Sequence, residues 1–360
     1  MNARIAFILS NLDEDGGQTV VCTLLKNLNK DKYTVKLFVL SSVVENKLTR
    51  ELAENNIYVD FLWKKATLES IRGISLLLEL NKAVKEFQPD VVHVHLDILY
   101  SWIWALWKKK RIIFTMHSEA NRIRNKYPKW LYRRLQSKNL IRVIGVSNSA
   151  SERFQTEFGS DKVETIYNPI ELKHFEQSVS KDNKIVKFIN VARFNPVKNH
   201  RLLIDAFEKI CTLGSNSILE LVGDGQEYEN IRKYVLEKKL GEKVKFLGQI
   251  EDVAPKLAGA DIFVLSSVSE AFPVSVIEAM AAGLPIIATN VGGLPELVKE
   301  NGILVESNNV EAMYSAMLDL EQNQEKRKQM GECSKTMAEK FDISEIVKQY
   351  EKVYDEEAGY

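Results

Sequence analysis

The sequence predicts an α/β fold built from two doubly wound, parallel sheets. Three observations predict this fold. Short apolar, β-branched runs recur along the 360 residues, and most of them lead into a polar or glycine-containing turn and then into helical periodicity. The chain is long enough for two domains of ordinary size. A polar stretch over 171–184 divides the runs into two series, which predicts one domain over 1–170 and a second over 171–342.

The first series opens with a buried strand, a polar loop that carries Gly16 and Gly17, and a helix over 18–28. A glycine pair before a helix lets backbone N–H groups approach a phosphate, although such a pair is also found in simple turns. A second helix over 74–87 is ended by Pro89. The apolar runs predict strands at 4–9, 35–40, 57–61, 90–95, 111–117, 142–146 and 163–167.

The second series repeats the same alternation. Its helices are predicted at 200–210, 254–260 and 274–282, with Gly283 free to adopt the left-handed conformation that ends the third, and a last helix covers 343–356. The apolar runs predict strands at 187–191, 218–225 (where the run ends in Gly-Asp-Gly), 244–248, 262–265, 284–289 and 303–305.

Bulk properties exclude several protein classes. No apolar run is long enough to span a bilayer, and no charged start followed by an apolar segment marks a signal peptide. The three cysteines, Cys22, Cys211 and Cys333, have no metal-ligand spacing and fit reduced thiols. We therefore expect a cytoplasmic protein.

The zero net charge hides a basic region in the first half. Twelve Lys or Arg residues and a single acid, Glu119, lie between Lys108 and Arg142. An aromatic, apolar stretch over 99–107 comes directly before them and fits either a core helix or a surface at the level of lipid headgroups. With the basic segment 127–140 it predicts peripheral contact with an anionic membrane. Nucleic acid is a weaker interpretation, because no recognition motif accompanies the charge.

Residues 262–293 contain a strand, a loop, a helix and a further strand. Glu270 lies in the loop and Glu278 in the second turn of the helix over 274–282, with Pro273 at the place that a helix favours for its first residue. The N–H groups of Val274 and Ser275 are then unpaired and suit a phosphate, while the carboxylates suit sugar hydroxyls. Taken singly, either glutamate also fits an ordinary solvated charge.

Two further groups of residues follow predicted strands. Arg193 and Lys198 lie in one loop, where both cations can surround a diphosphate, although loop cations are also common at surfaces. In the first half, His95, His117 and Asn148 each stand at the carboxyl end of a strand, where ligands bind in open α/β sheets. A zinc site is not indicated, because no carboxylate or cysteine accompanies the histidines.

The run SEAFPVSVIEAMAAGLPIIATNVGGLPELV, with two glutamates separated by seven residues, resembles the signature of retaining glycosyltransferase family 4 (glycosyl transferases group 1). The resemblance is to bacterial capsule and exopolysaccharide enzymes in particular. It implies the GT-B fold, in which two Rossmann-like domains face each other across a cleft. The first would bind the acceptor, the second the nucleotide-sugar, and helix 343–360 would pack back on the first. Ala271 departs from the family, which usually has Gly there, and this bears on donor-sugar specificity.

The resemblance also implies roles for individual residues. Glu270 would contact hydroxyls of the donor sugar, Glu278 would hold the ribose, and Arg193 and Lys198 would neutralise the departing diphosphate. His117 matches a histidine near the reacting sugar. The expected catalytic residues are Arg193, Lys198, Glu270 and His117. Donor-binding residues are expected at Gly17, Gly225, Phe272, Pro273, Val274, Ser275 and Glu278, and cleft or acceptor residues at His95 and Asn148.

The expected reaction is transfer of a sugar from a nucleotide-sugar, with UDP as the nucleotide, to a saccharide or undecaprenyl-diphosphate-linked acceptor. The resemblance implies retention of configuration. No metal-binding motif stands out, so we expect no metal ion and no other cofactor. A nucleotide-sugar epimerase or phosphorylase on the same fold is an alternative, as is a non-catalytic sugar-nucleotide-binding protein. Positioned acid and base carboxylates would favour an epimerase, and a cofactor lysine would favour a phosphorylase. Binding without turnover would favour the non-catalytic protein.

Overall fold

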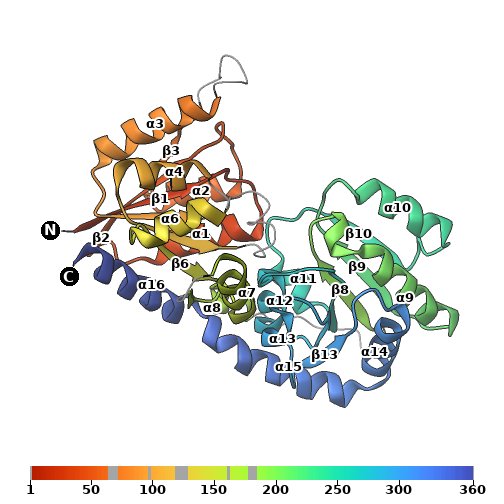
Figure 1. Cartoon of the computed structure of the whole chain (residues 1–360). Coiled ribbons are helices and arrows are strands. Elements are labelled where there is room, and N and C mark those ends of the chain that lie inside the picture. The colour runs from red at the N-terminus through yellow and green to blue at the C-terminus, as the bar shows by residue number, and fades with distance from the viewer. Residues whose placement is uncertain are drawn as a thin grey trace. The chain divides into compact units, whose positions relative to one another are not determined.

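The structure, a computed structural model, describes residues 2–63, 72–95, 99–117, 129–159, 163–176 and 185–359. The chain divides into two compact units (Figure 1). Unit 1 comprises Met1–Pro169 together with Ile343–Tyr360, and unit 2 comprises Ile170–Asp342. Each unit is an α/β domain with its own parallel sheet, which confirms the predicted fold class.

Unit 1 contains a seven-stranded sheet in the order β3-β2-β1-β4-β5-β6-β7, with all pairs parallel. The order reverses between β1 and β4, as it does in a Rossmann-like sheet. The strands are β1 (Ala3–Leu9), β2 (Tyr33–Val39), β3 (Val59–Phe61), β4 (Val91–His95), β5 (Ile112–Met116), β6 (Ile141–Gly145) and β7 (Glu164–Thr165).

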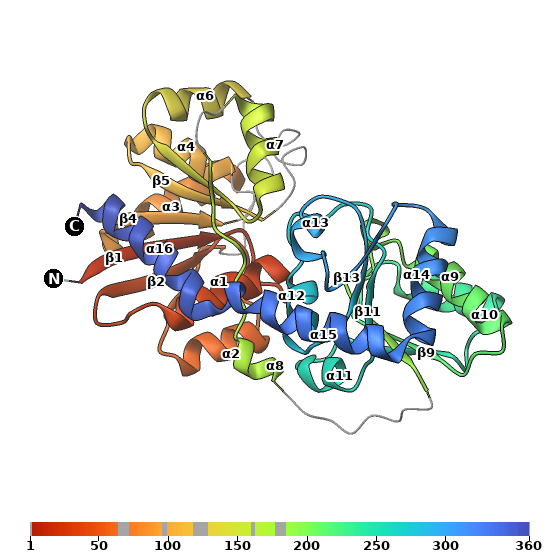
Figure 2. The same cartoon turned by 90° about the horizontal axis from the view of Figure 1, so that it is seen from below.

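Helices cover both faces of this sheet. One apolar core lies under α3, α4, α6 and α7, and a second lies under α1, α2 and α16 (Figure 2). Alternate side chains of the strands pack into the two cores, because successive side chains of a strand point to opposite faces. The helices are α1 (Gly16–Asn27), α2 (Lys47–Glu54), α3 (Arg72–Phe87), α4 (Leu99–Lys108), α6 (Lys129–Ser137), α7 (Asn148–Phe158) and α16 (Ile343–Ala358).

The last helix, α16, is part of unit 1 although it follows unit 2 in the chain. Its apolar side, which includes Tyr350 and Tyr354, is buried in the core beside α1. Its polar side is tied to the sheet, since Tyr33 donates a 2.7 Å hydrogen bond to Asp355 and Arg142 contacts Glu356 at 2.8 Å. The aromatic side chains anchor this segment to Phe7, Tyr33 and His93 on strands that lie far earlier in the chain.

Unit 2 contains a six-stranded parallel sheet in the order β10-β9-β8-β11-β12-β13, which reverses between β8 and β11. Asn190 in β8 donates a 2.7 Å hydrogen bond to the Val264 carbonyl in β11 and so joins the two strands at the reversal. The strands are β8 (Lys187–Val191), β9 (Ile218–Val222), β10 (Val244–Gly248), β11 (Ile262–Leu265), β12 (Ile286–Thr289) and β13 (Gly302–Val305).

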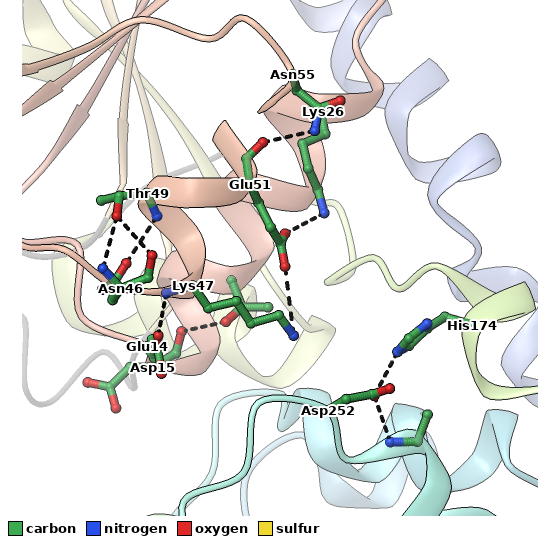
Figure 3. A network of polar contacts seen from close by, with 12 residues as sticks. Glu14, Asp15, Lys26, Asn46, Lys47, Thr49, Glu51, Asn55, His174 and Asp252 are labelled. Carbon is green, nitrogen blue, oxygen red and sulfur yellow. Dashed lines mark hydrogen bonds and ion pairs between the residues drawn. The ribbon is translucent and has the colours of Figure 1, made fainter. Parts of the chain in front are cut away.

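Helices surround this sheet as well, and α9, α10 and α14 contribute to its main core. Near the start of the unit, His174 contacts Asp252 at 2.8 Å, and Asp252 also accepts from the Ala254 N–H at the beginning of α11 (Figure 3). The helical segments are α8 (Leu172–Phe175), η2 (Pro196–Lys198), α9 (His200–Thr212), α10 (Tyr228–Glu237), α11 (Ala254–Ala258), α12 (Val274–Ala281), α13 (Leu294–Leu297), α14 (Val310–Gln322), α15 (Gln324–Ala338) and η3 (Glu339–Phe341).

Every apolar run that predicts a strand forms one, with ends that shift by a few residues. The prediction of a continuous linker over 171–184 was wrong at its start, because Leu172–Phe175 forms α8 and buries Phe175. Residues 177–184 lie outside the described residues. Helices α2, α7 and α10 were not predicted, since their sequences are rich in polar residues and contain no long apolar run.

The aromatic stretch before the basic region forms α4, which confirms the interpretation as a core helix for one of its sides, while contact with a membrane stays a prediction. Trp102 and Trp104 are buried in the core of unit 1, whereas Ile103 and Trp107 are exposed. The side chain of Tyr100, all of residues 118–128 and hence several of the predicted cations lie outside the described residues. Among the described residues, no helix combines the length and apolar character needed to cross a bilayer.

Candidate functional site

Each sheet places candidate residues at the point where its strand order reverses. In unit 2 the loops after β8 and β11 carry Lys198 and Glu270, and in unit 1 β1 and β4 lead to Gly17 and His95. Neighbouring loops run in opposite directions at such a point, so they open a crevice beyond the carboxyl ends of the strands. The strand topology therefore brings together residues that lie about 70 or more positions apart in the chain.

Lys198 and Glu270 form an ion pair in unit 2. The ammonium nitrogen lies 2.5 Å from Oε1 of the carboxylate, and the two side chains are only 19% and 10% exposed. The hydroxyl of Ser267 donates a second 2.5 Å hydrogen bond to the same Oε1. Among the described residues none bonds Oε2, so this oxygen can accept a hydrogen bond from a ligand.

The loops that carry the pair are held by buried polar contacts. Ser266, directly after β11, donates to the carbonyl oxygens of Lys198 and Asn199 at 2.9 and 3.0 Å. The backbone N–H of Val268 donates to the Val197 carbonyl at 2.8 Å. The last residues of the loop after β8, 197–199, are thus bonded to the loop after β11, which limits how far Lys198 can move from Glu270.

Helix α12 begins four residues after Glu270. Val274 is its first residue, as predicted, and Pro273 is its N-cap rather than its first helical residue. Proline has no side-chain acceptor, so the N-cap side chain leaves the N–H groups of Val274 and Ser275 without a cap bond. Phe272 is buried against Phe341, with ring centroids 5.4 Å apart, and anchors the chain just before the helix. Glu278 is half-buried, one turn further on.

The Gly-Asp-Gly turn after β9 packs directly on the loop that contains Arg193. The N–H of Phe194 donates to the Asp224 carbonyl at 2.8 Å. Gly225 has φ +149°, and a Cβ there would lie 2.5 Å from the Phe194 carbonyl oxygen. Only glycine fits this conformation and this approach. The guanidinium-bearing Arg193 is exposed beside the turn.

In unit 1 three histidines gather behind the ends of β4 and β5. The rings of His93 and His95 lie with centroids 3.9 Å apart and are tilted by 37°, and Nδ1 of His95 lies 3.0 Å from Nε2 of His117. His93 is bonded on its other side by Tyr354 of α16 at 2.8 Å and by Thr115 at 2.7 Å. Nε2 of His95 and Nδ1 of His117 are buried and have no partner among the described residues.

Burial keeps these imidazoles neutral. It lowers the pKa of His93 and of His95 well below the usual value near 6.5, and it lowers the pKa of His117 to about 4. A positive charge on a neighbouring ring would add repulsion in the same direction. The cluster therefore presents hydrogen-bonding nitrogens rather than a cation at neutral pH.

The loop before Gly17 is held by the start of α2 (Figure 3). The side chain of Asn46 donates to the Leu12 carbonyl at 2.6 Å, and Oε1 of Glu14 accepts from the Lys47 N–H at 2.8 Å. Gly17 is the second residue of α1, whose N-cap Asp15 makes no side-chain cap bond. Three acids, at positions 13–15, precede it, so the local charge favours hydroxyl groups over a phosphate.

Asn148 is exposed at the first position of α7, after β6, and donates a 3.0 Å hydrogen bond to the Tyr167 hydroxyl. The predicted residues thus fall into two groups, one in each unit. Arg193, Lys198, Gly225, Glu270, Phe272, Pro273, Val274, Ser275 and Glu278 belong to unit 2, and Gly17, His95, His117 and Asn148 belong to unit 1.

Some positioning residues were missed at the level of the sequence. Ser266 and Ser267 follow a buried strand directly, which was a usable signal for a ligand-binding edge. His200 stacks on Phe194, with centroids 4.2 Å apart and rings 4° from parallel, and no described residue bonds either ring nitrogen. Burial and the nearby Lys198 lower the pKa of His200 to about 4. Within the described part of the chain, no three His, Cys, Asp or Glu side chains converge as a metal site would require.

Known proteins match both halves of the chain. The family model Glycosyltransferase Family 4 matches residues 15–174, and the model Glycosyl transferases group 1 matches residues 171–337. The N-acetyl-alpha-D-glucosaminyl L-malate synthase of Bacillus anthracis is 27% identical over 87% of this chain and 93% of its own. The UDP-Gal:alpha-D-GlcNAc-diphosphoundecaprenol alpha-1,3-galactosyltransferase of Escherichia coli is 27% identical over 79% of each chain.

Among solved structures, HepE from Anabaena in complex with UDP-glucose has a TM-score of 0.82. It is 18% identical, and the match covers 98% of this chain and 99% of that one. At this identity the likeness concerns the fold, and it agrees with the two Rossmann-like sheets described above.

Proposed function

Because the chain belongs to glycosyltransferase family 4, whose two models together account for residues 15–337, we propose that it transfers a sugar from a UDP-sugar to a lipid-linked saccharide, with retention of configuration and without a metal ion. The observation that carries the proposal is the Lys198–Glu270 ion pair at the strand reversal of unit 2, four residues before the uncapped start of α12. Cation, carboxylate and free N–H groups are the chemistry that a nucleotide-sugar requires.

Transfer breaks the bond between the anomeric carbon and the diphosphate oxygen. Negative charge grows on the diphosphate as positive charge grows at the sugar. Lys198 and Arg193 supply cations for the first, and the N–H groups of Val274 and Ser275 add fixed dipoles. These groups are in place before the reaction and take the role that a divalent ion has in other transferases.

Glu270 binds rather than attacks in this proposal. Its Oε1 is occupied by Lys198 and Ser267, which orients Oε2 as an acceptor for a hydroxyl of the donor sugar. A carboxylate bound in this way is a weak nucleophile. Retention then follows from attack on the face that the diphosphate leaves, with the proton of the acceptor hydroxyl passing to the departing phosphate oxygen. Glu278, one turn into α12, holds the ribose.

Unit 1 binds the acceptor in this proposal, with His95, His117 and Asn148 at the carboxyl ends of its strands. A lipid-linked acceptor is supported by the Escherichia coli relative, which is named for transfer to alpha-D-GlcNAc-diphosphoundecaprenol, and UDP by the UDP-glucose complex of HepE. The chain would then act in bacterial surface polysaccharide biosynthesis, in the cytoplasm and at the inner face of the membrane.

The test measures release of nucleoside diphosphate from a panel of UDP- and GDP-sugars in EDTA. It compares the wild type, Glu278→Ala and the control Glu237→Ala, whose side chain is 59% exposed on α10. Release from one UDP-sugar that Glu278→Ala loses and the control keeps is the expected result. Dependence on added Mg²⁺ would contradict the metal-free mechanism. Tight donor binding with no release, even with lipid-linked acceptors added, would favour a binding protein.

A further inference from the structure

Unit 1 exposes large apolar side chains on three neighbouring helices. Helix α4 packs against both α3 and α6, and all three cover the same face of the sheet (Figures 1 and 2). The exposed side chains are Ile74 and Leu78 on α3, Ile103 and Trp107 on α4, and Trp130 on α6. We call this set, with the cations around it, the α3–α4–α6 surface.

These side chains are not needed for the core. Trp102 and Trp104 already anchor α4 in the interior, whereas Trp107 and Trp130 are 51% and 63% exposed. The spacing of four residues places Ile103 and Trp107 on one side of their helix, and Ile74 and Leu78 are spaced in the same way on α3. Apolar side chains gathered on adjacent helices mark an interaction surface more often than scattered single residues do.

Cations surround the two exposed tryptophans. Eight Lys or Arg residues and no acid occur in residues 99–117 and 129–138, whereas α3 carries both acids and cations, Glu79, Lys82, Lys85 and Glu86. Arg111 pairs with Glu357 and Lys129 with Glu157. Among the described residues no acid pairs with the other six, which are Lys108, Lys109, Lys110, Arg133, Arg134 and Lys138.

On α4 and α6, cations lie close to the exposed tryptophans in space or in sequence. Nζ of Lys108 lies 3.9 Å from the centre of the Trp107 ring, so apolar ring and cation share one position on the surface. On α6, Arg133 and Arg134 are exposed a few residues after Trp130. Tryptophan prefers the headgroup level of a bilayer, and Lys and Arg extend their charges from there to anionic headgroups.

We propose that the α3–α4–α6 surface docks unit 1 on an anionic lipid bilayer, with Trp107, Trp130 and Ile103 inserted among the headgroups. The complementarity of charge selects an anionic surface, and the exposed indoles select a bilayer over a soluble polyanion. The inference deepens the proposed function, because a lipid-linked acceptor would be presented in such a bilayer to the unit that binds it.

The experiment uses the full chain and vesicles of phosphatidylcholine with about one third phosphatidylglycerol, and vesicles of phosphatidylcholine alone. Cosedimentation and the shift of tryptophan fluorescence report docking, with no donor or acceptor present. The variants are Trp107→Ala with Trp130→Ala, and Arg133→Glu with Arg134→Glu. The matched control is Leu213→Ala with Leu236→Ala, two leucines of unit 2 that are 60% and 64% exposed.

The wild type is expected to bind the anionic vesicles with a blue-shifted emission and to ignore the neutral ones. Each cation contributes a factor of roughly five to binding, so reversing two arginines lowers the partition coefficient by more than about a hundredfold. Removing both indoles lowers it by at least about tenfold, and the control leaves it unchanged.

Equal binding to both kinds of vesicle, no binding, or an equal loss in the control would overturn the proposal. If duplex DNA displaces the protein from anionic vesicles and binds it more tightly than they do, the partner of this surface is nucleic acid and not a bilayer. Donor turnover is measured separately in vesicle-free solution. A protein that releases nucleoside diphosphate but ignores vesicles therefore refutes the docking surface alone, and the reverse result refutes the transferase alone.

Discussion

Nζ of Lys198 lies 2.5 Å from Oε1 of Glu270, and the loops that carry the two residues are bonded to each other through Ser266 and Val268. The pair is mostly shielded from water, so each partner depends on the other. Removal of the cation leaves a half-desolvated carboxylate, and removal of the carboxylate leaves the cation free to turn away from the site.

We predict that Lys198→Met lowers kcat for donor turnover by about 10²- to 10³-fold, since it removes a preorganised charge from the departing diphosphate. It should also lower the free energy of unfolding by about 1–3 kcal/mol, because the Glu270 carboxylate loses its partner. Lys209→Met is the matched control, since Lys209 pairs with Glu311 on the exposed surface of the same unit. Steady-state kinetics and urea unfolding check both, and a wild-type kcat in Lys198→Met would refute the role.

In unit 1, the single hydrogen bond between His95 and His117 constrains both tautomers. Either His95 donates from Nδ1, or His117 donates from Nε2. In the first case the neutral His117 carries its proton on Nδ1, and in the second His95 carries its proton on Nε2. The two remaining nitrogens, Nε2 of His95 and Nδ1 of His117, are buried and have no partner among the described residues. In each case one of them carries an N–H and the other a lone pair. A substrate that bonds His117 therefore selects the tautomer of His95.

We predict that His95→Phe lowers kcat by about tenfold, because His117 loses the bond that orients it, which is worth about 1–2 kcal/mol. His95→Asn keeps a donor near the position of Nδ1 and should restore most of the rate. KM for the donor should change little in either variant. Steady-state kinetics with a fixed acceptor check the pair, and equal rates in the wild type and His95→Phe would contradict it.

Much of the fold could be predicted because its strands are short and apolar and lie between turns that the sequence marks. The positions of Lys198, Glu270 and His117 after strands could be predicted for the same reason, and their roles stay predictions. The division of the strands into two separate sheets was indicated by the polar stretch that begins near residue 171. Local patterns sufficed here because the site is built from strand ends.

Contacts between distant segments could not be predicted. His93 is bonded to Tyr354, 261 residues later, and nothing in the local pattern of either residue indicates the other. The sequence did not show which side of α4 is buried, because in a mostly apolar helix the spacing of apolar residues does not separate a core side from an exposed one. The start of α12 at Val274 was predicted, but Pro273 was assigned to the first helical position and is the N-cap, because proline fits both positions almost equally well.

Acid should destabilise the protein in a defined pH range. His200 is buried and neutral with a pKa of about 4, against 6.5 in the unfolded chain, so the unfolded state binds more protons between these values. Stability is therefore full above about pH 6.5 and is lost as the pH falls toward 4. At about pH 5 the loss attributable to His200 is about 2 kcal/mol. His117 adds to the loss in the same range.

His200→Phe isolates this contribution, because phenylalanine keeps the stack on Phe194 and has no titrating group. Urea unfolding at about pH 7 and about pH 5 should show that the variant loses about 2 kcal/mol less than the wild type over this interval. At neutral pH its stability should equal or exceed that of the wild type, since no buried ring nitrogen remains without a partner. An identical pH dependence in the two proteins would contradict the assignment.

The two glycines of the turn after β9 allow a close backbone approach to the loop that contains Arg193. Added Cβ atoms would lie 2.1 Å from the Ala192 carbonyl oxygen at Gly223 and 2.5 Å from that of Phe194 at Gly225, and both residues have positive φ. These are rigid backbone atoms, so the loop with Arg193 would have to move.

We predict that Gly225→Ala lowers the free energy of unfolding by about 2–4 kcal/mol and raises KM for the donor, because clash and backbone strain add together. Gly214→Ala is the matched control. Gly214 also has positive φ, at +81°, but a Cβ there would meet nothing within 4 Å. It should lose only about 1 kcal/mol with unchanged kinetics. If the two variants lost equal stability and both kept the wild-type KM, strain alone would account for the effect, and the turn would have no part in holding the donor loop.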